Sequence, residues 1–254
     1  MKKKILIVTE RRADYSKFKP ILDEIKKSKS LSYVLIVTGS HLLKKHGYTI
    51  NEIKKDGFKI SDQFSMYGSN SLNNGAEMVK SFGKSVIKIT SLVEKYNPDI
   101  ILSGFDIGAN LAAAIVGAHM NKVVAHIEGG EVSGTIDESI RHAITKFAHL
   151  HFTTNLIASK RLVKMGENKK FIFTVGNSSL DSILKIPKVS KKQISADYDL
   201  KSEQPYIVVT MHTVTSEIKK IQSYMKNVLD AITELNLQAI LIRGNADAGS
   251  NKML

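Results

Sequence analysis

Short apolar, β-branched runs alternate with longer segments of helical period along most of the chain, and this alternation constrains the fold most strongly. The runs typical of strands are Lys4–Thr9, Tyr33–Thr38, Asp99–Leu102, Lys122–His126, His149–Thr153 and Phe171–Val175. The segments with helical period are Tyr15–Lys27, Ala76–Lys95, Gly108–Met120, Asp137–Phe147 and Asn155–Met165. Such an order predicts βαβ units. We therefore expect an α/β fold, a Rossmann-like doubly wound parallel sheet covered on both faces by helices.

The same pattern predicts two domains. Residues 185–204 contain five lysines and Pro187 but few large apolar residues, which is typical of a connector. We expect an N-terminal Rossmann-like domain over 1–184, a linker over 185–204, and the start of a second, incomplete Rossmann-like domain over 205–254. Three segments are expected to begin that second domain: a strand at Tyr206–Met211, a helix at Ser216–Leu235 and a strand at Gln238–Ile242.

Composition limits the classes of function. The 254 residues include 37 Lys and Arg against 24 Asp and Glu, a net charge of +13, which favours anionic partners. The lysines are scattered and accompany no nucleic-acid-binding motif, so we expect no nucleic-acid partner. The sequence holds no cysteine, which excludes disulfides, thiolate metal sites and cysteine nucleophiles.

The chain shows no segment typical of membrane insertion or export. It has no run of about 18 apolar residues, and the apolar stretch after its first lysines is too short for a signal peptide. We therefore expect a cytoplasmic protein without a membrane partner. The Gly-x-Gly-x-x-Gly fingerprint and the Walker A sequence are also absent, which removes the main support for an oxidoreductase or a P-loop ATPase.

Charged and hydroxyl side chains gather where four of the predicted strands end, and most of these strand ends also carry glycines. In open parallel sheets, ligands bind at the carboxyl ends of the strands. The four clusters are Glu10-Arg-Arg-Ala-Asp14, Thr38-Gly-Ser-His41, Ser103-Gly-Phe-Asp-Ile-Gly108 and Glu128-Gly-Gly-Glu131. Within the first, Arg12 is well placed for a phosphate or carboxylate, although a solvated loop arginine is an equal alternative.

Acidic residues are densest around the fourth cluster. Glu128, Glu131, Asp137 and Glu138 surround three glycines, and Arg141 and His142 follow one turn later. Carboxylates held together in a partly desolvated cleft have divergent pKa values, which supplies one acid and one base. One of the pair Asp137 and Glu138 could instead stabilise the start of the following helix. The same alternative applies to Asp106, although the glycines beside it allow a ligand to approach the backbone.

Histidines recur in two places. His126, His142, His149 and His151 fall within 26 residues, but their spacing does not match a metal site, so we expect no metal. His212 ends the first strand of the second predicted domain and is expected to face the cleft between domains.

Taken together, these stretches resemble the hydrolysing UDP-N-acetylglucosamine 2-epimerases, which make N-acetylmannosamine for sialic-acid-type sugars. The matching stretches, in the family's order, are Arg12–Tyr15, Val37–Leu43, Gly104–Asp106, His126–His142, Thr210–His212 and Asn245–Ser250. The His126–His142 run is the most specific of them.

The resemblance implies two Rossmann-like domains of the GT-B type with a UDP-sugar between them. It implies that Asp106, Glu128 and Asp137 are the catalytic carboxylates, that His212 is a histidine of the cleft, and that Arg12 lies near the nucleotide phosphates. Further substrate contacts are expected from Asp14, His41, Glu131, Arg141, His142, Asn245 and Asp247. A homodimer is also implied.

The implied reaction removes the C2 proton of the sugar and expels UDP from C1, which leaves a 2-acetamidoglucal. Water then adds to give N-acetylmannosamine with inverted C2. We assign acid and base to the carboxylates as a group, and we expect no cofactor.

The chain departs from the family's pattern in three respects. It has Glu10-Arg11-Arg12 where members often have Gly-Thr-Arg, and Phe105-Asp106-Ile107 where they often have Gly-Asp-Arg. Members also continue through the rest of the second domain, so we expect weak or no turnover from the 254 residues alone. The alternatives are an inactive truncated remnant that only binds a sugar nucleotide or a partner, an epimerase acting on a UDP-diacetamido sugar, and a glycosyltransferase of the same fold.

Overall fold

The computed structural model describes residues 2–68, 75–214 and 217–242. The chain separates into two compact units, which are treated individually below. Unit 1 comprises residues 1–68 and 79–185, and unit 2 comprises residues 69–78 and 186–254.

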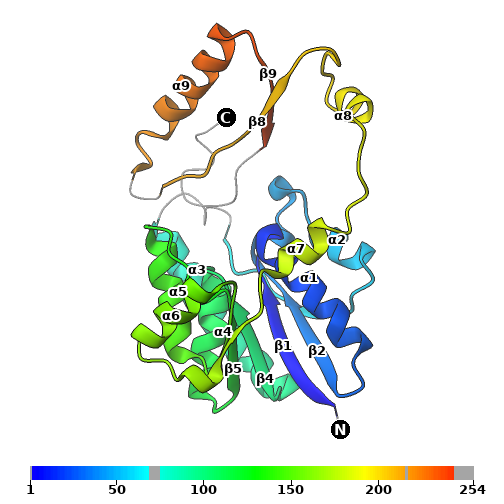
Figure 1. The fold of residues 1–254 in the computed structure, drawn as a ribbon. Coiled ribbons are helices and arrows are strands. Elements are labelled where there is room, and N and C mark those ends of the chain that lie inside the picture. The colour runs from blue at the N-terminus through cyan, green and yellow to red at the C-terminus, as the bar shows by residue number, and fades with distance from the viewer. Residues whose placement is uncertain (1, 69–74, 215–216, 243–254) are drawn as a thin grey trace. The chain divides into compact units, whose positions relative to one another are not determined.

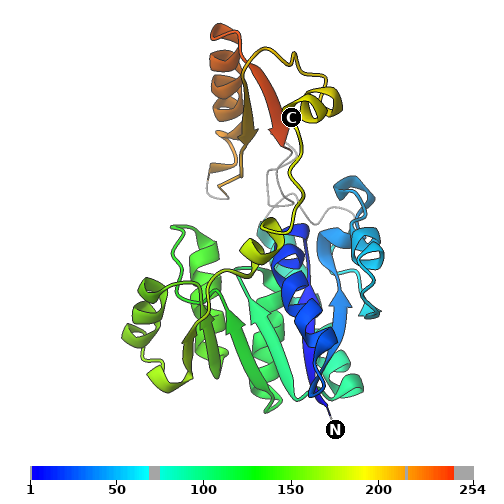
Figure 2. The same ribbon diagram turned by 45° about the vertical axis from the view of Figure 1, so that its right-hand side comes forward.

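Unit 1 is built on a parallel sheet of seven strands. The strands are β1 (Lys3–Thr9), β2 (Leu31–Val37), β3 (Ile60–Gln63), β4 (Ile100–Gly104), β5 (Val123–Ile127), β6 (Leu150–Thr153) and β7 (Ile172–Thr174). The helices are α1 (Arg12–Lys27), α2 (Ile50–Lys55), α3 (Gly75–Tyr96), α4 (Gly108–His119), α5 (Ile136–Phe147), α6 (Leu156–Lys164) and α7 (Ser178–Ile183), with short 3-10 turns η1 (Gly39–Leu42), η2 (Lys44–His46) and η3 (Lys169–Phe171). Figures 1 and 2 show helices on both faces of this sheet.

The strand order is β3-β2-β1-β4-β5-β6-β7 with parallel pairing throughout. The sheet grows in one direction from β1 to β3 and in the other from β4 to β7, so a topological switch point lies between β1 and β4. The predicted Rossmann-like α/β class is thereby confirmed. The sequence missed β3, because this edge strand has only one apolar residue among Ile60-Ser-Asp-Gln.

Alternating side chains of the strands form two cores. Ile7 of β1 and Leu35 of β2 pack with Phe18 of α1 in one core. Val124 of β5 packs with Ala114 of α4 and Ile144 of α5 in another. Ala125 and Ile127, which point to the opposite side of β5 from Val124, belong to the first core. Because successive strand side chains point to opposite faces, α1 covers one face and α4 with α5 covers the other.

Unit 2 contains one βαβ element. β8 (Tyr206–Thr210) pairs in parallel with β9 (Gln238–Ile242), and α9 (Ile221–Glu234) connects them, in the order that the sequence predicts. Its small core contains Ile221 and Met225, packed against partly buried Met211 and Ile218. The stretch expected to be a linker holds a helix, α8 (Lys191–Asp197), which the Ser190 side chain caps by accepting from Gln193 N.

Within the described ranges, no helix is both long and apolar enough to cross a lipid bilayer.

Candidate active site

The loop after β4 carries Asp106 in a strained turn. Phe105 has a φ of +66°, a conformation that is costly for a bulky side chain and that persists only where the surroundings enforce it. Gly104 precedes it because a Cβ there would lie 2.5 Å from Ile127 Cγ1 on β5. Asp106 remains partly exposed and forms an ion pair with Arg141 of α5. The turn therefore presents a carboxylate at the strand end, next to a cation.

Glu128 holds the corresponding place after β5. Its φ is +61°, and its N–H donates to Phe152 O at 2.9 Å. Its Oε2 accepts from Lys17 Nζ of α1 at 2.5 Å. Its Oε1 is buried and, among the described residues, has no hydrogen-bond partner. A buried acceptor without a donor costs free energy, and such atoms in native folds call for an explanation such as a ligand or a water.

Lys17 connects the two strand ends. Besides its bond to Glu128, its Nζ lies 4.7 Å from the centroid of the Phe105 ring, a cation–π contact beside Asp106. Lys17 was not among the residues selected from the sequence. No local signal distinguishes it from the other lysines of α1, because its partner lies 111 residues away.

The two glycines after Glu128 are required by packing. A Cβ on Gly129 would lie 2.8 Å from His126 Nδ1. Gly130 has a φ of +85°, and a Cβ there would lie 2.6 Å from Ala158 O. The Gly130 carbonyl also accepts from Arg161 Nη1. These glycines therefore fold the acidic loop closely against β5 and α6.

Further along this loop, Glu131 is tied to the turn after β6. One of its carboxylate oxygens accepts from Thr154 Oγ1 and from Asn155 Nδ2. Its backbone carbonyl accepts from Arg141 Nη1 at 3.0 Å. Arg141 thus joins Glu131 to Asp106, and the structure brings these three predicted residues together.

The start of α5 separates the roles of two neighbouring acids. Thr135 caps the helix by accepting from Asp137 N at 3.3 Å. Glu138 Oε2 accepts from Ser133 N and Gly134 N, both at 2.9 Å, and these backbone N–H groups lower the pKa of Glu138. Glu138 is therefore the acid that stabilises the helix start. Asp137, half-buried in the same first turn, stays a candidate for catalysis.

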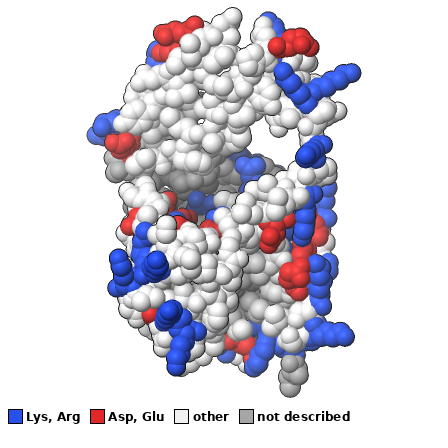
Figure 3. All heavy atoms as spheres, in the orientation of Figure 1, with Lys and Arg blue, Asp and Glu red and all other residues white. Residues whose placement is uncertain are grey.

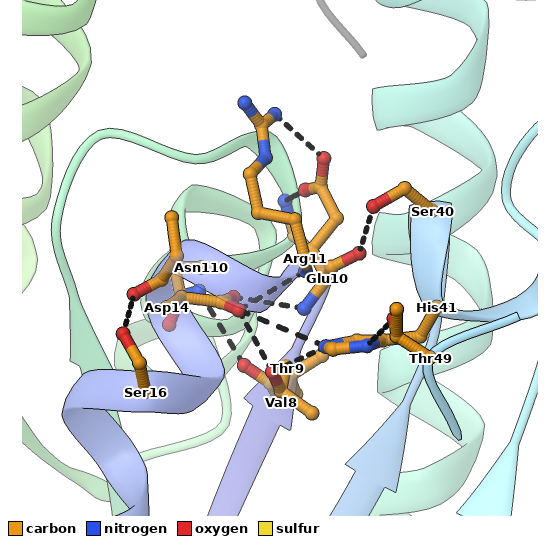
Figure 4. A network of polar contacts seen from close by, with 12 residues as sticks. Val8, Thr9, Glu10, Arg11, Asp14, Ser16, Ser40, His41, Thr49 and Asn110 are labelled. Carbon is orange, nitrogen blue, oxygen red and sulfur yellow. Dashed lines mark hydrogen bonds and ion pairs between the residues drawn. The ribbon is translucent and has the colours of Figure 1, made fainter. Parts of the chain in front are cut away.

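The loops after β1 and β2 form a closed network around Asp14 (Figure 4). Asp14 is 1% exposed and accepts from Thr9 Oγ1, from Glu10 N and from Arg11 N. Burial raises the pKa of Asp14 to about 6. As placed, Asp14 has no surface for the substrate contact expected of it.

His41 lies in the same network and is fully buried. Its Nε2 lies 3.0 Å from Thr9 Oγ1 and its Nδ1 lies 2.7 Å from Thr49 Oγ1. Burial lowers the pKa of His41 to about 4, so the ring is neutral near pH 7. Arg12, by contrast, is the exposed first residue of α1. Of the three binding residues predicted here, only Arg12 faces solvent.

The histidines of β5 and β6 are structural. His126 is fully buried with its Nδ1 3.2 Å from Thr145 Oγ1, and burial lowers its pKa to about 3. His151 lies beside it in the sheet, 3.3 Å from Glu167 Oε2. His142 lies one turn after Glu138, with its Nε2 3.9 Å from Glu138 Oε1. Across the described part of the chain, no three His, Asp or Glu residues gather in a way that could hold a metal ion.

The remaining predictions concern unit 2. His212 is exposed just after β8. Asn245 and Asp247 lie outside the described residues. The roles expected of all three stay predictions.

The ends of β4 and β5 therefore bring two of the predicted catalytic carboxylates to the same edge of the sheet. Gly104 and Ile127 are register partners, so the residues that follow them, which lead to Asp106 and Glu128, leave neighbouring strands at the same edge. The fold and this edge define an α/β protein with basic-paired carboxylates beside the switch point of a doubly wound sheet.

Comparisons with known proteins identify the family. The sequence profile of the UDP-N-acetylglucosamine 2-epimerase family matches residues 23–254, and the chain belongs to this family. It is 35% identical over 251 residues to a hydrolysing UDP-N,N'-diacetylbacillosamine 2-epimerase of Legionella pneumophila, covering 99% of this chain and 66% of that protein. It is also 35% identical over 252 residues to a UDP-N-acetylglucosamine 2-epimerase of Neisseria meningitidis, covering 99% of this chain and 65% of that protein.

A solved structure agrees with this fold. The crystal structure of the Neisseria meningitidis UDP-GlcNAc 2-epimerase bound to UDP-GlcNAc superposes with a TM-score of 0.81 and 17% identity, covering 98% of this chain and 68% of that one. The chain thus spans about two thirds of the length of the proteins it resembles. The resemblance inferred from the sequence is confirmed at the level of family and fold.

Proposed function

We propose that the protein containing these residues is a hydrolysing 2-epimerase that converts UDP-N-acetylglucosamine to N-acetylmannosamine and UDP. One observation carries the proposal. Asp106 and Glu128 leave adjacent strands at one edge, each paired with a cation, and Glu128 Oε1 is left buried without a donor among the described residues. An acceptor of this kind suits a general base whose partner is a substrate proton.

The chemistry divides into two steps. A carboxylate of the set Asp106, Glu128 and Asp137 takes the C2 proton, the C1–C2 double bond forms, and the C1–O bond breaks with its electron pair leaving on UDP. A second acidic group then returns a proton to C2 from the opposite face while water adds its oxygen to C1 and gives one of its protons to that group. The first carboxylate releases the original C2 proton to solvent. Cations near the edge, the exposed Arg12 among them, stabilise the departing diphosphate.

The substrate has a second candidate, a UDP-diacetamido sugar. The Legionella pneumophila relative carries that specificity in its name, and its identity to this chain equals that of the Neisseria meningitidis relative. The two sugars are distinguished outside C1 and C2, so the carboxylate set serves either. A binding protein without turnover is the other alternative.

The surface charge supports a small anionic ligand. On the face drawn in Figure 3, lysines and arginines lie in small groups with acidic side chains among them. Nucleic acid binding favours a continuous basic stripe, which that face does not present. The homodimer, the absence of a cofactor and the cytoplasmic location stay predictions.

The test incubates the purified protein with each UDP-sugar in D2O and follows UDP and the free sugar by NMR. Elimination and hydration place solvent deuterium at C2 of the product, and H2¹⁸O places its oxygen at C1. Asp106→Asn and Glu128→Gln are expected to abolish the signal. Turnover that persists in both variants contradicts the proposal, whereas UDP-sugar binding without release of UDP by wild type supports the binding protein.

A further inference from the structure

Glu10 is a buried carboxylate that the proposed reaction does not use. It follows β1 directly, beside the switch point, and is 1% exposed. A carboxylate so deeply buried needs a reason of its own. Its Oε1 accepts from Tyr67 Oη at 2.5 Å and from Arg11 Nη2 at 2.9 Å. Its Oε2 accepts from Ala109 N at 2.9 Å.

The contact with Ala109 crosses the switch point. Ala109 is the second residue of α4, and the two partners are 99 residues apart in sequence. The first N–H groups of a helix have no partner within the helix, and a carboxylate there satisfies one of them and complements the helix dipole. Glu10 therefore fixes the start of α4 to the end of β1.

This anchor sets one end of the loop that carries Asp106. The loop leaves β4 at Gly104, where Phe105 N donates to Ile127 O at 3.4 Å. It enters α4 at Gly108, next to the residue that Glu10 holds. Asp106 thus lies between two fixed points, one on β5 and one on Glu10.

Glu10 itself has little freedom to move. Gly39, with a φ of +64°, packs so closely that a Cβ would lie 2.3 Å from Glu10 Cγ. The carbonyl of Glu10 accepts from Ser40 Oγ at 3.2 Å and from His41 N at 3.4 Å. Figure 4 shows the Glu10 carboxylate next to the Arg11 guanidinium and its carbonyl oxygen next to Ser40. The loop after β2 thereby holds Glu10 in place at the end of β1.

We propose that Glu10 is a positioning residue for the reaction: by holding the first turn of α4, it fixes Asp106 opposite Arg141. The proposal rests on the function proposed above. Glu10 acts through Asp106 and touches no reacting atom. A displacement of about 1 Å in a reacting group is enough to lower a rate by about 100-fold, so a contact that fixes the loop of Asp106 affects turnover.

The test compares three forms of the protein. Glu10→Gln keeps the shape, but its single carbonyl oxygen cannot serve both sides, so an NH2 group faces either the Ala109 N–H or the Arg11 and Tyr67 donors. Tyr67→Phe is the matched control, because it removes one donor to Oε1 and leaves the contact with Ala109. Hydrogen–deuterium exchange of residues 105–110 and steady-state kinetics are measured for each form.

For Glu10→Gln we expect amide exchange in residues 105–110 to quicken about 10-fold, kcat to fall about 10- to 100-fold, and KM to change less than about 3-fold. Tyr67→Phe is expected to stay within about 3-fold of wild type in each quantity. If Glu10→Gln does not fold, Ala109→Pro is used instead, since it removes the N–H that donates to Glu10. Proline is tolerated in the first helical turn, and the same faster amide exchange is expected in the loop.

Exchange and kcat that match wild type in the folded variant overturn the positioning role and leave the proposed function intact. Turnover at the wild-type rate in both Asp106→Asn and Glu128→Gln contradicts the proposed function, whatever Glu10 does. If wild type shows no turnover, the exchange of residues 105–110 alone decides whether Glu10 holds the loop.

Discussion

The two halves of the carboxyl edge of unit 1 differ in how far their polar groups are satisfied. After β1 and β2, the side chains of Asp14 and His41 are fully buried, and each finds partners in neighbouring loops. After β4 and β5, Asp106 is partly exposed, and Glu128 keeps one oxygen without a donor among the described residues. We call the loops after β1 and β2 the closed half and the loops after β4 and β5 the open half.

This difference separates architecture from chemistry. A buried polar network in which every member is satisfied fixes one arrangement of the backbone. A partly satisfied carboxylate beside a cation still has an interaction to offer a ligand. Both halves are rich in charged residues in the sequence, and only the partners of each group distinguish them.

The largest effect is expected from exchanging one acid in each half. Asp106→Asn should lower turnover by about 10²- to 10⁴-fold, the range of a lost general acid or base, and change the free energy of unfolding by less than about 1 kcal/mol. Asp14→Asn should cost about 1–3 kcal/mol of stability, because an amide NH2 then faces a backbone N–H. Kinetics and urea unfolding of both variants check this. A larger loss of stability for Asp106→Asn than for Asp14→Asn contradicts the comparison.

A second effect concerns the close packing of Gly39 against Glu10 in the closed half. Gly39→Ala should destabilise the protein by about 2–4 kcal/mol, because the residue has a positive φ and a Cβ would overlap Glu10. Gly83→Ala is the matched control. Gly83 lies within α3 with no atom within 4 Å of a new Cβ, so alanine should stabilise by about 0.5–1 kcal/mol. If both substitutions change the free energy of unfolding in urea by the same amount, Gly39 does not pack closely against Glu10.

The pH dependence of stability tests the buried histidines. The pKa values of His41 and His126 are lowered to about 4 and about 3, so their contribution is complete above pH 6.5 and is lost progressively as the pH falls from 6.5 toward the folded values. Asp14, with a pKa raised to about 6, acts oppositely, and its contribution is recovered as the pH falls below 6. Between pH 7 and pH 5 we expect a net loss of about 2 kcal/mol. His126→Gln should remove most of that loss, and an unchanged slope in this variant excludes His126 as a cause.

The smallest effect concerns Lys17, a cation of the open half. Lys17→Met should lower turnover about 10-fold, because it removes the donor to Glu128 Oε2 and the contact with Phe105. Lys19→Met is the control on the same helix, since Lys19 pairs with Asp56 at 2.6 Å instead. Kinetics of both variants at one pH check this. A fall of the same size for Lys19→Met attributes the loss to α1 in general.

Elements whose residues carry their own signal were predicted well. β1, β4 and β5 each contain a short apolar run, and α4 begins at the predicted Gly108. β3 was missed because its polar residues at an edge resemble a loop. The acids at the strand ends were found because topology places every parallel strand end at one edge. The contacts that hold this edge were not, because Lys17 reaches Glu128 over 111 residues and Glu10 reaches Ala109 N over 99 residues. No local pattern encodes such pairs.

By itself, the sequence determined the order of strands and helices, the parallel sheet and the strand ends that carry charge, because periodicity and turn residues act locally. Only the tertiary structure decided which of those charges are enclosed and which stay available. That distinction depends on burial and on donors supplied by distant segments, such as Thr9 and the backbone for Asp14, and Lys17 for one oxygen of Glu128. The free energy of a buried carboxylate is set by those neighbours, which chain order does not disclose.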